Sequence, residues 1–117
     1  MPALHLTGRD EPIAGRVERA LSLRARLVGL LGRASLDADE GLWIEPCDSI
    51  HTFFMRFPID AAFVDRHGVV VRVLSDLKPW RATRIHARAR AVVELRAGTL
   101  ARAGVEIGAK LSLDPPP

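Results

Sequence analysis

The amino-acid sequence predicts a mainly β protein: a single-domain β-sandwich or partly closed barrel of seven or eight short strands with one short α-helix. Short apolar runs recur along the 117 residues and are separated by turn-forming Gly, Pro, Asp and Ser. Only one stretch carries apolar residues at helical spacing over several turns. Strands and helices do not alternate in the βαβ order that builds a parallel sheet.

Length and composition indicate one globular domain over residues 1–117, because a chain of this size buries one core and not two. Hydrophobic residues make up 48% and charged residues 26%, which excludes a disordered chain. No apolar run approaches the roughly 20 residues of a membrane-spanning helix. The first residues lack the features of a secretory signal. We therefore expect a cytoplasmic protein with no membrane partner, and a single Cys excludes an intramolecular disulfide.

The first part of the chain is expected to supply two strands, a helix and a third strand. Residues 3–6 and 13–20 alternate around a polar turn, which predicts an opening β-hairpin or two neighbouring strands. Residues 22–32 form the predicted α-helix, since Ser22 can cap its start and leucines recur at helical spacing before a glycine. After a polar turn, residues 42–45 resume an extended pattern.

The middle of the chain is predicted to form the centre of the core. Residues 50–57 are apolar on both parities, as in strands that are covered on two faces. Pro58 ends that strand because it lacks a backbone N–H, and residues 59–65 begin the next. Gly68 closes a turn into the β-branched strand at residues 69–74, so these two strands form a hairpin.

The last part of the chain is predicted to add short elements and a tail. Residues 84–87 and 91–95 are expected to be strands, and residues 97–104 permit one helical turn. A final strand at residues 110–113 precedes an exposed, proline-rich tail at residues 114–117.

Five motifs in order resemble those of domain of unknown function family 192. They are RLVGLLGR at 26–33, GLWI at 41–44, FFMRFPIDAAFVD at 53–65, VVELRAG at 92–98 and GVEIG at 104–108. The resemblance covers about residues 13–113 and implies a small, mostly β domain with no established activity. The short spacing from Met55 to Asp60 is similar to a Pro-Cys-containing variant of the family. Where the family has an Asp near its end, this chain has residues 109–111, AKL, which implies no carboxylate role there.

Cys47 and His51 are candidates for a nucleophile and its base, with Asp60 as a further catalytic candidate. On an extended strand, however, Cys47 and His51 would lie roughly 13 Å apart, beyond hydrogen-bond reach, and only a tight turn at residues 46–49 could bring them together. A packed, inert Cys and a metal ligand are the alternatives. Too few Cys, His and carboxylate residues cluster to predict a metal site, so no metal and no cofactor are expected.

The surface around residues 47–60 is expected to bind a ligand, because polar side chains punctuate an apolar stretch there. Arg56 either binds a carboxylate or phosphate or forms an ion pair with Asp60 across the bend at Pro58. The apolar residues are expected to fill the core, with an apolar cleft or partner surface as the alternative. The predicted ligand-binding residues are Ser49, His51, Thr52, Arg56 and Trp80.

The leading functional hypothesis is a non-catalytic binding module for a small molecule or a protein segment. One alternative is a thiol- or acid/base-dependent enzyme that uses Cys47 and His51. A second is non-specific nucleic-acid association through Arg81–Arg90, next to Trp80. Arginines on a solvated loop or edge strand explain the same pattern, because they block pairing between sheets, so nucleic acid is not the expected partner. The identity of the ligand and the oligomeric state are not predicted.

Overall fold

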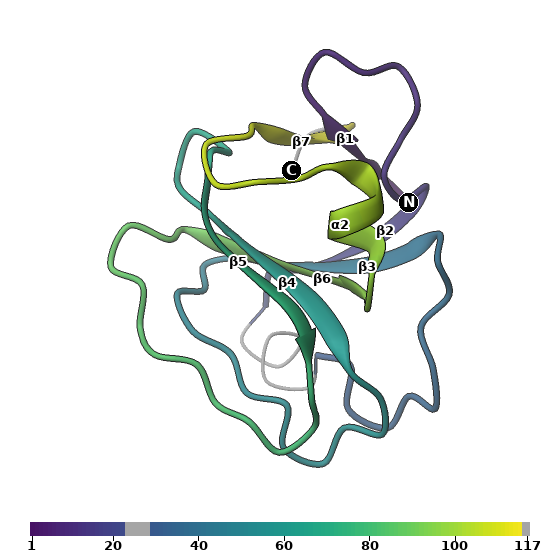
Figure 1. Ribbon diagram of the computed structural model, residues 1–117, viewed down its shortest axis with the longest axis vertical. Helices are drawn as coiled ribbons and strands as arrows, with labels where there is room; N and C mark the ends of the chain where they lie inside the picture. Colours follow the sequence, from purple (N-terminus) through teal and green to yellow (C-terminus); the bar gives the residue numbers. More distant parts are fainter. Residues whose placement is uncertain (23–28, 116–117) are drawn as a thin grey trace.

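The structure, a computed structural model, describes residues 1–22 and 29–115, which contain seven strands and one short helix (Figure 1). The predicted mainly β class is confirmed. The α-helix predicted at residues 22–32 falls mostly on residues 23–28, outside the described residues, and residues 29–32 form turns. None of the described helices is long and apolar enough to cross a membrane. In chain order the elements are β1 (Ala3–Leu6), β2 (Arg16–Ala20), β3 (Glu40–Ile44), β4 (Ile59–Val64), β5 (Val70–Leu77), β6 (Ala91–Arg96), α2 (Thr99–Ala103) and β7 (Leu111–Asp114).

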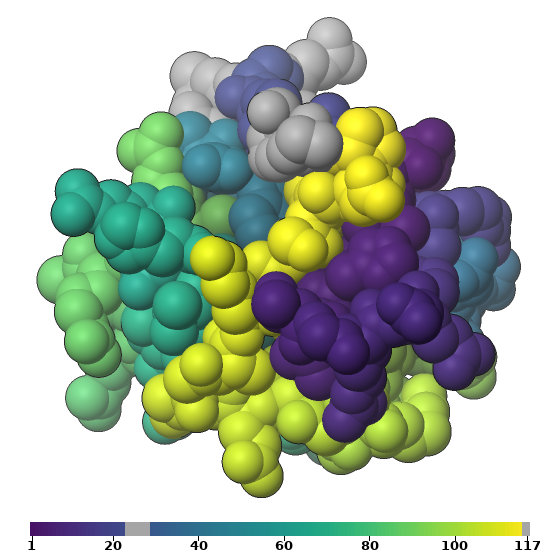
Figure 2. All heavy atoms as spheres, turned by 90° about the horizontal axis from the view of Figure 1, so that it is seen from above, coloured from purple at the N-terminus to yellow at the C-terminus, as the bar shows by residue number. Residues whose placement is uncertain are grey.

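The strands form two sheets that do not close into a barrel. β1 and β7 pair antiparallel, and Figure 2 shows the N-terminal segment in purple beside the C-terminal segment in yellow. The other strands form a sheet in the order β2–β3–β6–β4–β5, in which β2 and β3 are parallel and the remaining pairs antiparallel. The predicted opening hairpin is not formed, because β1 and β2 lie in different sheets. The two strands are neighbours, as in the alternative prediction, joined by an antiparallel bridge from Leu4 to Ala14 and by a hydrogen bond from the Val17 N–H to the Pro2 carbonyl at 2.9 Å.

The five-stranded sheet is covered on both faces, which explains the near-continuous apolar sequences of its central strands. Every residue of β4 is buried, as are the first five of β6. On one face, β1, β7 and α2 contribute Leu4, Leu111, Leu113 and Leu100 to a core shared with the sheet. On the other face, loop residues such as Leu36 and Met55 pack against side chains of β3 and β4. Burial on both faces therefore accounts for the apolar residues at successive positions of β4 and β6.

Most of the remaining element predictions are confirmed within a few residues. These are the strands at residues 42–45, 59–65, 69–74, 91–95 and 110–113, and the helical turn within 97–104. The predicted hairpin is formed by β4 and β5, and Gly68 in its turn has the expected positive φ of 82°. The tail is exposed at Asp114 and Pro115, while residues 116–117 lie outside the described part.

Two predicted strands are wrong. Residues 50–57 do not form the central strand but a loop. The only strand-like pairing of this loop in the described part of the chain is the isolated β-bridge from His51 to Ala82. Only Thr52 and Met55 of this loop are buried, whereas the side chain of Phe54 is exposed. Residues 84–87 also lie in a loop. The apolar pattern on both parities therefore reflects a loop that covers the sheet with some side chains and exposes others.

Asp60 connects three parts of this fold. Its fully buried carboxylate accepts a hydrogen bond from the backbone N–H of Asp76 at 2.9 Å, near the end of β5. The other carboxylate oxygen accepts the N–H groups of Gly98 and Leu100, both at 3.0 Å, at the start of α2. A carboxylate satisfies such unpaired donors better than a neutral acceptor does. Asp60 therefore fixes both the end of β5 and the start of α2 to β4.

Replacing Asp60 should destabilise the protein, because three backbone donors lose their acceptor. We expect Asp60→Ala to lower the free energy of unfolding by about 4 kcal/mol and Asp60→Asn, which keeps one acceptor oxygen, by about 2 kcal/mol. Urea denaturation measures both values. The matched control is Asp48→Asn, at an exposed aspartate, which should change stability little. An Asp60→Ala variant as stable as the control would contradict this role.

Candidate functional site

Thr52 clamps the loop of residues 51–56 to the loop that follows β5. Its backbone N–H donates to the carbonyl of Arg81 at 2.8 Å, and its hydroxyl donates to the carbonyl of Lys78 at 2.6 Å. In return, the N–H of Arg81 donates to the Thr52 hydroxyl at 3.0 Å, and the N–H of Trp80 donates to the Thr52 carbonyl at 3.0 Å. Thr52 is fully buried, so this small polar side chain replaces the ladder of a regular strand pair.

The clamp presents a group of exposed aromatic rings, which we name the aromatic patch: His51, Phe53, Phe54 and Trp80. The rings of Phe54 and Trp80 are 4.6 Å apart, although Phe54 is 70% exposed and Trp80 57% exposed. Phe53 lies between the others, 5.0 Å from His51 and 6.2 Å from Trp80. Figure 1 places the loop that follows β5 at the end of the molecule away from β1, β7 and α2.

The backbone of the aromatic patch is held in a strained conformation. Phe54 has a φ of 67° and Trp80 a φ of 66°, a region that bulky side chains seldom adopt. Such residues persist only where surrounding bonds impose them, and they cluster at binding and catalytic sites. The hydrogen bonds of Thr52 impose them here. Backbone strain and exposed apolar rings thus coincide in the aromatic patch.

Two arginines lie close in sequence to residues of the aromatic patch. Arg56 follows Phe54 by two residues and Arg81 follows Trp80, and both are exposed. The guanidinium of Arg81 donates only to the carbonyl of Pro79, at 3.4 Å, among the bonds that join described residues. Lys78 is instead paired with Asp76 at 2.6 Å. The two arginines are therefore available to an acceptor on a partner.

Cys47 and His51, the predicted nucleophile and base, form hydrogen bonds with different residues. The Cys47 thiol donates to the carbonyl of Ser49 at 3.0 Å, and Cys47 is half-buried against the sheet. The Nδ1 atom of His51 accepts the N–H of Phe53 at 3.3 Å. Ser49, half-buried, has its hydroxyl 3.4 Å from a carboxylate oxygen of Asp48.

The ion pair predicted between Arg56 and Asp60 is not formed. Asp60 is fully buried and its oxygens accept three backbone N–H groups, whereas Arg56 is exposed.

In the two described ranges, no group of three or more His, Cys, Asp or Glu side chains is arranged to hold a metal.

The arginines of residues 81–90 differ in their surroundings. Arg84 and Arg88 are exposed, while Arg90 pairs with Glu45 at 3.4 Å. His86 within this segment packs edge-on against Phe63, with ring centroids 4.5 Å apart. The segment is a solvated loop that is anchored to the sheet at His86, rather than an edge strand.

Glu94 is a buried titratable residue that the sequence analysis did not single out. It lies on the central strand β6, paired with Leu42 of β3 and Ala61 of β4, and is 4% exposed. Burial raises the pKa of its carboxyl from 4.5 to about 7. Side chains alternate along a strand, so Glu94 shares a face with Val92, on the side where Cys47 packs. The available signal was an acidic residue inside an otherwise apolar strand sequence.

Two cavities lie outside the aromatic patch. One, of about 350 Å³, is lined by residues that include Leu36, Phe57 and Arg96. The other, of about 320 Å³, lies between the segment that follows β1 and helix α2. Residues of the aromatic patch line neither of them, so the patch presents exposed rings rather than either of these pockets.

The comparisons with known proteins identify a family and a fold. The model of DUF192, described as Uncharacterized ACR, matches residues 4–113. A protein of unknown function from Novosphingobium aromaticivorans DSM 12444 is 24% identical, with a TM-score of 0.83 over 96% of this chain and 84% of that one. A putative transcription regulator from Sinorhizobium meliloti 1021 is 23% identical, with a TM-score of 0.79 over 97% and 93%. No curated protein is significantly similar. At these identities, the structural likeness establishes the fold alone.

Glu94 should make stability depend on pH. The folded chain keeps the Glu94 proton up to about pH 7, whereas the unfolded chain releases it near pH 4.5, so rising pH favours unfolding between these values. We expect this group to lower the free energy of unfolding by roughly 3 kcal/mol across that window. The measurement is urea denaturation of the wild type and Glu94→Gln at several pH values. The difference between them isolates Glu94, and parallel pH profiles would show the assignment to be wrong.

Proposed function

The chain belongs to the DUF192 family, and because membership assigns no activity, we propose from the site itself that the protein is a binding module that takes a protein segment on the aromatic patch. The observation that carries this proposal is the exposure of two neighbouring rings, Phe54 and Trp80, on strained backbone. Large exposed apolar groups gathered in one place are typical of interaction surfaces. A fold alone would gain stability by avoiding both the strain and the exposure.

Preorganisation supports a binding role. The Thr52 hydrogen bonds hold the rings before a partner arrives, so association orders few additional side chains. Aromatic side chains and Arg are the residue types that contribute most to binding energy at protein interfaces. Phe54, Trp80 and the bordering Arg81 supply both types.

The chemistry of the aromatic patch favours a segment with an apolar anchor next to an acidic residue. The rings can cover an aliphatic or aromatic side chain, and Arg56 and Arg81 can donate to a neighbouring carboxylate or carbonyl group. The rings of Phe54 and Trp80 stand largely in solvent, and such exposed apolar surface favours a protein segment over a small molecule, which is usually enclosed in a cleft. In this proposal Thr52 positions the two loops, while His51, Trp80 and Arg56 contact the segment.

The test uses a displayed library of random 12-residue peptides, from which binders are selected on the wild-type protein and then synthesised. We expect Phe54→Asn and Trp80→Ala to weaken their binding at least about tenfold, as removal of a central interface residue does. Phe54→Asn should also leave the free energy of unfolding unchanged or higher, because Asn tolerates positive φ better than Phe. Fluorescence anisotropy and urea denaturation measure the two effects.

The matched control is Ile107→Ser, which removes an apolar side chain that is 64% exposed outside the aromatic patch. Its peptide affinity should equal that of the wild type. The proposal fails if selection yields no binder, or if the peptides bind the Phe54 and Trp80 variants as tightly as the control.

Nucleic acid is the second candidate partner, because Trp80 adjoins a loop with four exposed arginines, of which Arg90 pairs with Glu45, while Arg81, Arg84 and Arg88 are in no ion pair with a described residue. Stacking rings beside cationic side chains are typical of surfaces that bind single strands. The Sinorhizobium protein with the same fold is described as a putative transcription regulator, which is a class of protein that binds nucleic acid. The likeness to that protein extends to the fold alone.

A labelled single-stranded oligonucleotide tests this second candidate. If it binds, we expect log Kd to rise linearly with log salt concentration, and Arg84→Gln together with Arg88→Gln to reduce the slope by about one to two. Absence of binding at low salt, or binding that does not respond to salt, would exclude nucleic-acid association through this loop.

A further inference from the structure

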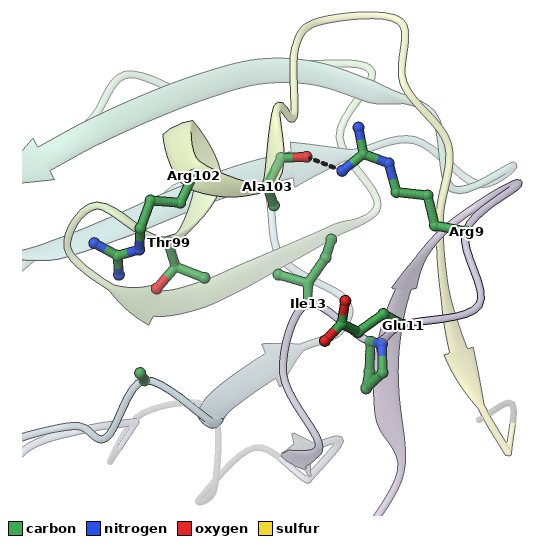
Figure 3. A pocket seen from close by; sticks show the side chains of 8 residues that line it. Arg9, Glu11, Ile13, Thr99, Arg102 and Ala103 are labelled. Atoms are coloured by element: carbon green, nitrogen blue, oxygen red, sulfur yellow. Dashed lines mark hydrogen bonds between the residues drawn. The ribbon is translucent and has the colours of Figure 1, made fainter.

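A second site is built at the other side of the fold, where the segment after β1 faces helix α2. The cavity there is about 320 Å³, within the range of small-ligand pockets. Arg9, Glu11 and Ile13 line it from the segment, and Thr99, Arg102 and Ala103 line it from α2 (Figure 3). Residues three and four apart share a face of a helix, which explains why these three positions of α2 face one cavity.

Thr99 has a polar atom without a protein partner. The residue is 6% exposed, and its hydroxyl makes no hydrogen bond to any described residue. Figure 3 shows this oxygen pointing out of the helix on the side along which Arg102 extends. Buried hydroxyls nearly always have a partner, because an unpaired one is costly to the fold. A ligand in the cavity would supply the missing partner.

Arg102 supplies charge beside this hydroxyl. No hydrogen bond or ion pair connects its guanidinium to another described residue. It lies against the backbone at Gly98, where an added Cβ would come within 2.9 Å of Arg102 Nη1. Gly98 therefore leaves room for the guanidinium next to Thr99. The planar fork of Arg can donate two parallel hydrogen bonds to a carboxylate or a phosphate.

Two backbone N–H groups at the start of α2 are already paired outside this site, since those of Gly98 and Leu100 donate to the buried Asp60 carboxylate. Across the cavity, Arg9 closes the wall by donating to the carbonyl of Ala103 at 2.8 Å, which joins the segment to the end of α2 (Figure 3). The site thus consists of side chains around a preformed space.

We propose that the end of this cavity at Arg102 and Thr99 binds a small monocarboxylate. Arg102 and Thr99 would donate to the carboxylate. Glu11 lies at the opposite end of the lining (Figure 3), so one small ligand does not reach both Glu11 and Arg102. With Arg9 and Arg102 opposed by Glu11, the lining has a net charge of +1, which suits a monoanion better than a phosphate dianion. Ile13 offers a short apolar contact. This site is independent of the aromatic patch.

The test is titration of the ¹⁵N-labelled protein with four probes: L-lactate, L-alanine, propionate and inorganic phosphate. We expect saturable amide shifts at residues 98–103 with lactate and propionate, and weaker binding of phosphate and of alanine, whose ammonium group would lie near the Arg102 guanidinium. Thr99→Val and Arg102→Gln should each weaken lactate binding at least about tenfold. Glu11→Gln, at the opposite end of the lining, should still bind both lactate and propionate.

A stability measurement separates a binding role from a structural one. Without ligand, Thr99→Val should raise Tm by about 4 °C, because a methyl group replaces an unpaired buried hydroxyl. Arg88→Gln, at an exposed arginine outside the cavity, is the control and should bind lactate as the wild type does. The proposal is overturned if no probe gives saturable shifts up to about 10 mM. Equal binding by the Thr99 and Arg102 variants, or tighter binding of phosphate than of lactate, would also overturn it.

Discussion

The buried carboxylate of Asp60 holds the parts of the chain on which both candidate sites depend. One oxygen accepts the N–H of Asp76, just before the loop that carries Trp80, and the other accepts two N–H groups at the start of α2, which carries Thr99 and Arg102. Asp60 itself lies on β4, whose residues are all buried. A single side chain in the rigid centre of the sheet thus positions a loop and a helix that are separate in sequence.

The two sites use this support differently. In the aromatic patch, the hydrogen bonds of Thr52 impose positive φ on Phe54 and Trp80 and leave their rings in solvent. Beside α2, the fold instead leaves the Thr99 hydroxyl unpaired next to a cavity. Both features cost stability, and a fold under selection for stability alone would lose them. That shared cost is the physical reason for assigning a binding role to each place.

Local sequence patterns predict β4 and its hairpin with β5, because a short apolar run lies between Pro58 and a turn that ends at Gly68. The same reasoning fails at residues 50–57, since apolar residues on both parities fit a doubly covered strand and equally a covering loop. The deciding contacts of Thr52 lie 26 to 29 residues away, at Lys78 and Arg81. The partners of Asp60 likewise lie 16 to 40 residues away in the sequence. Local sequence therefore suggested an ion pair with Arg56, which is close in the chain, and gave no sign of the backbone partners. The predicted ligand-binding residues His51, Thr52, Trp80 and Arg56 lie in or beside the aromatic patch, whereas the exposure of Phe54 follows only from the three-dimensional arrangement.

The most direct measurement is amide hydrogen exchange, followed by NMR, at Asp76, Gly98 and Leu100 in the wild-type protein. If the Asp60 carboxylate holds these three groups, their N–H protons will exchange as slowly as those of the buried strand β4. Exchange at the rate of an unstructured chain at these three positions would show that Asp60 does not join β5 and α2 to the sheet.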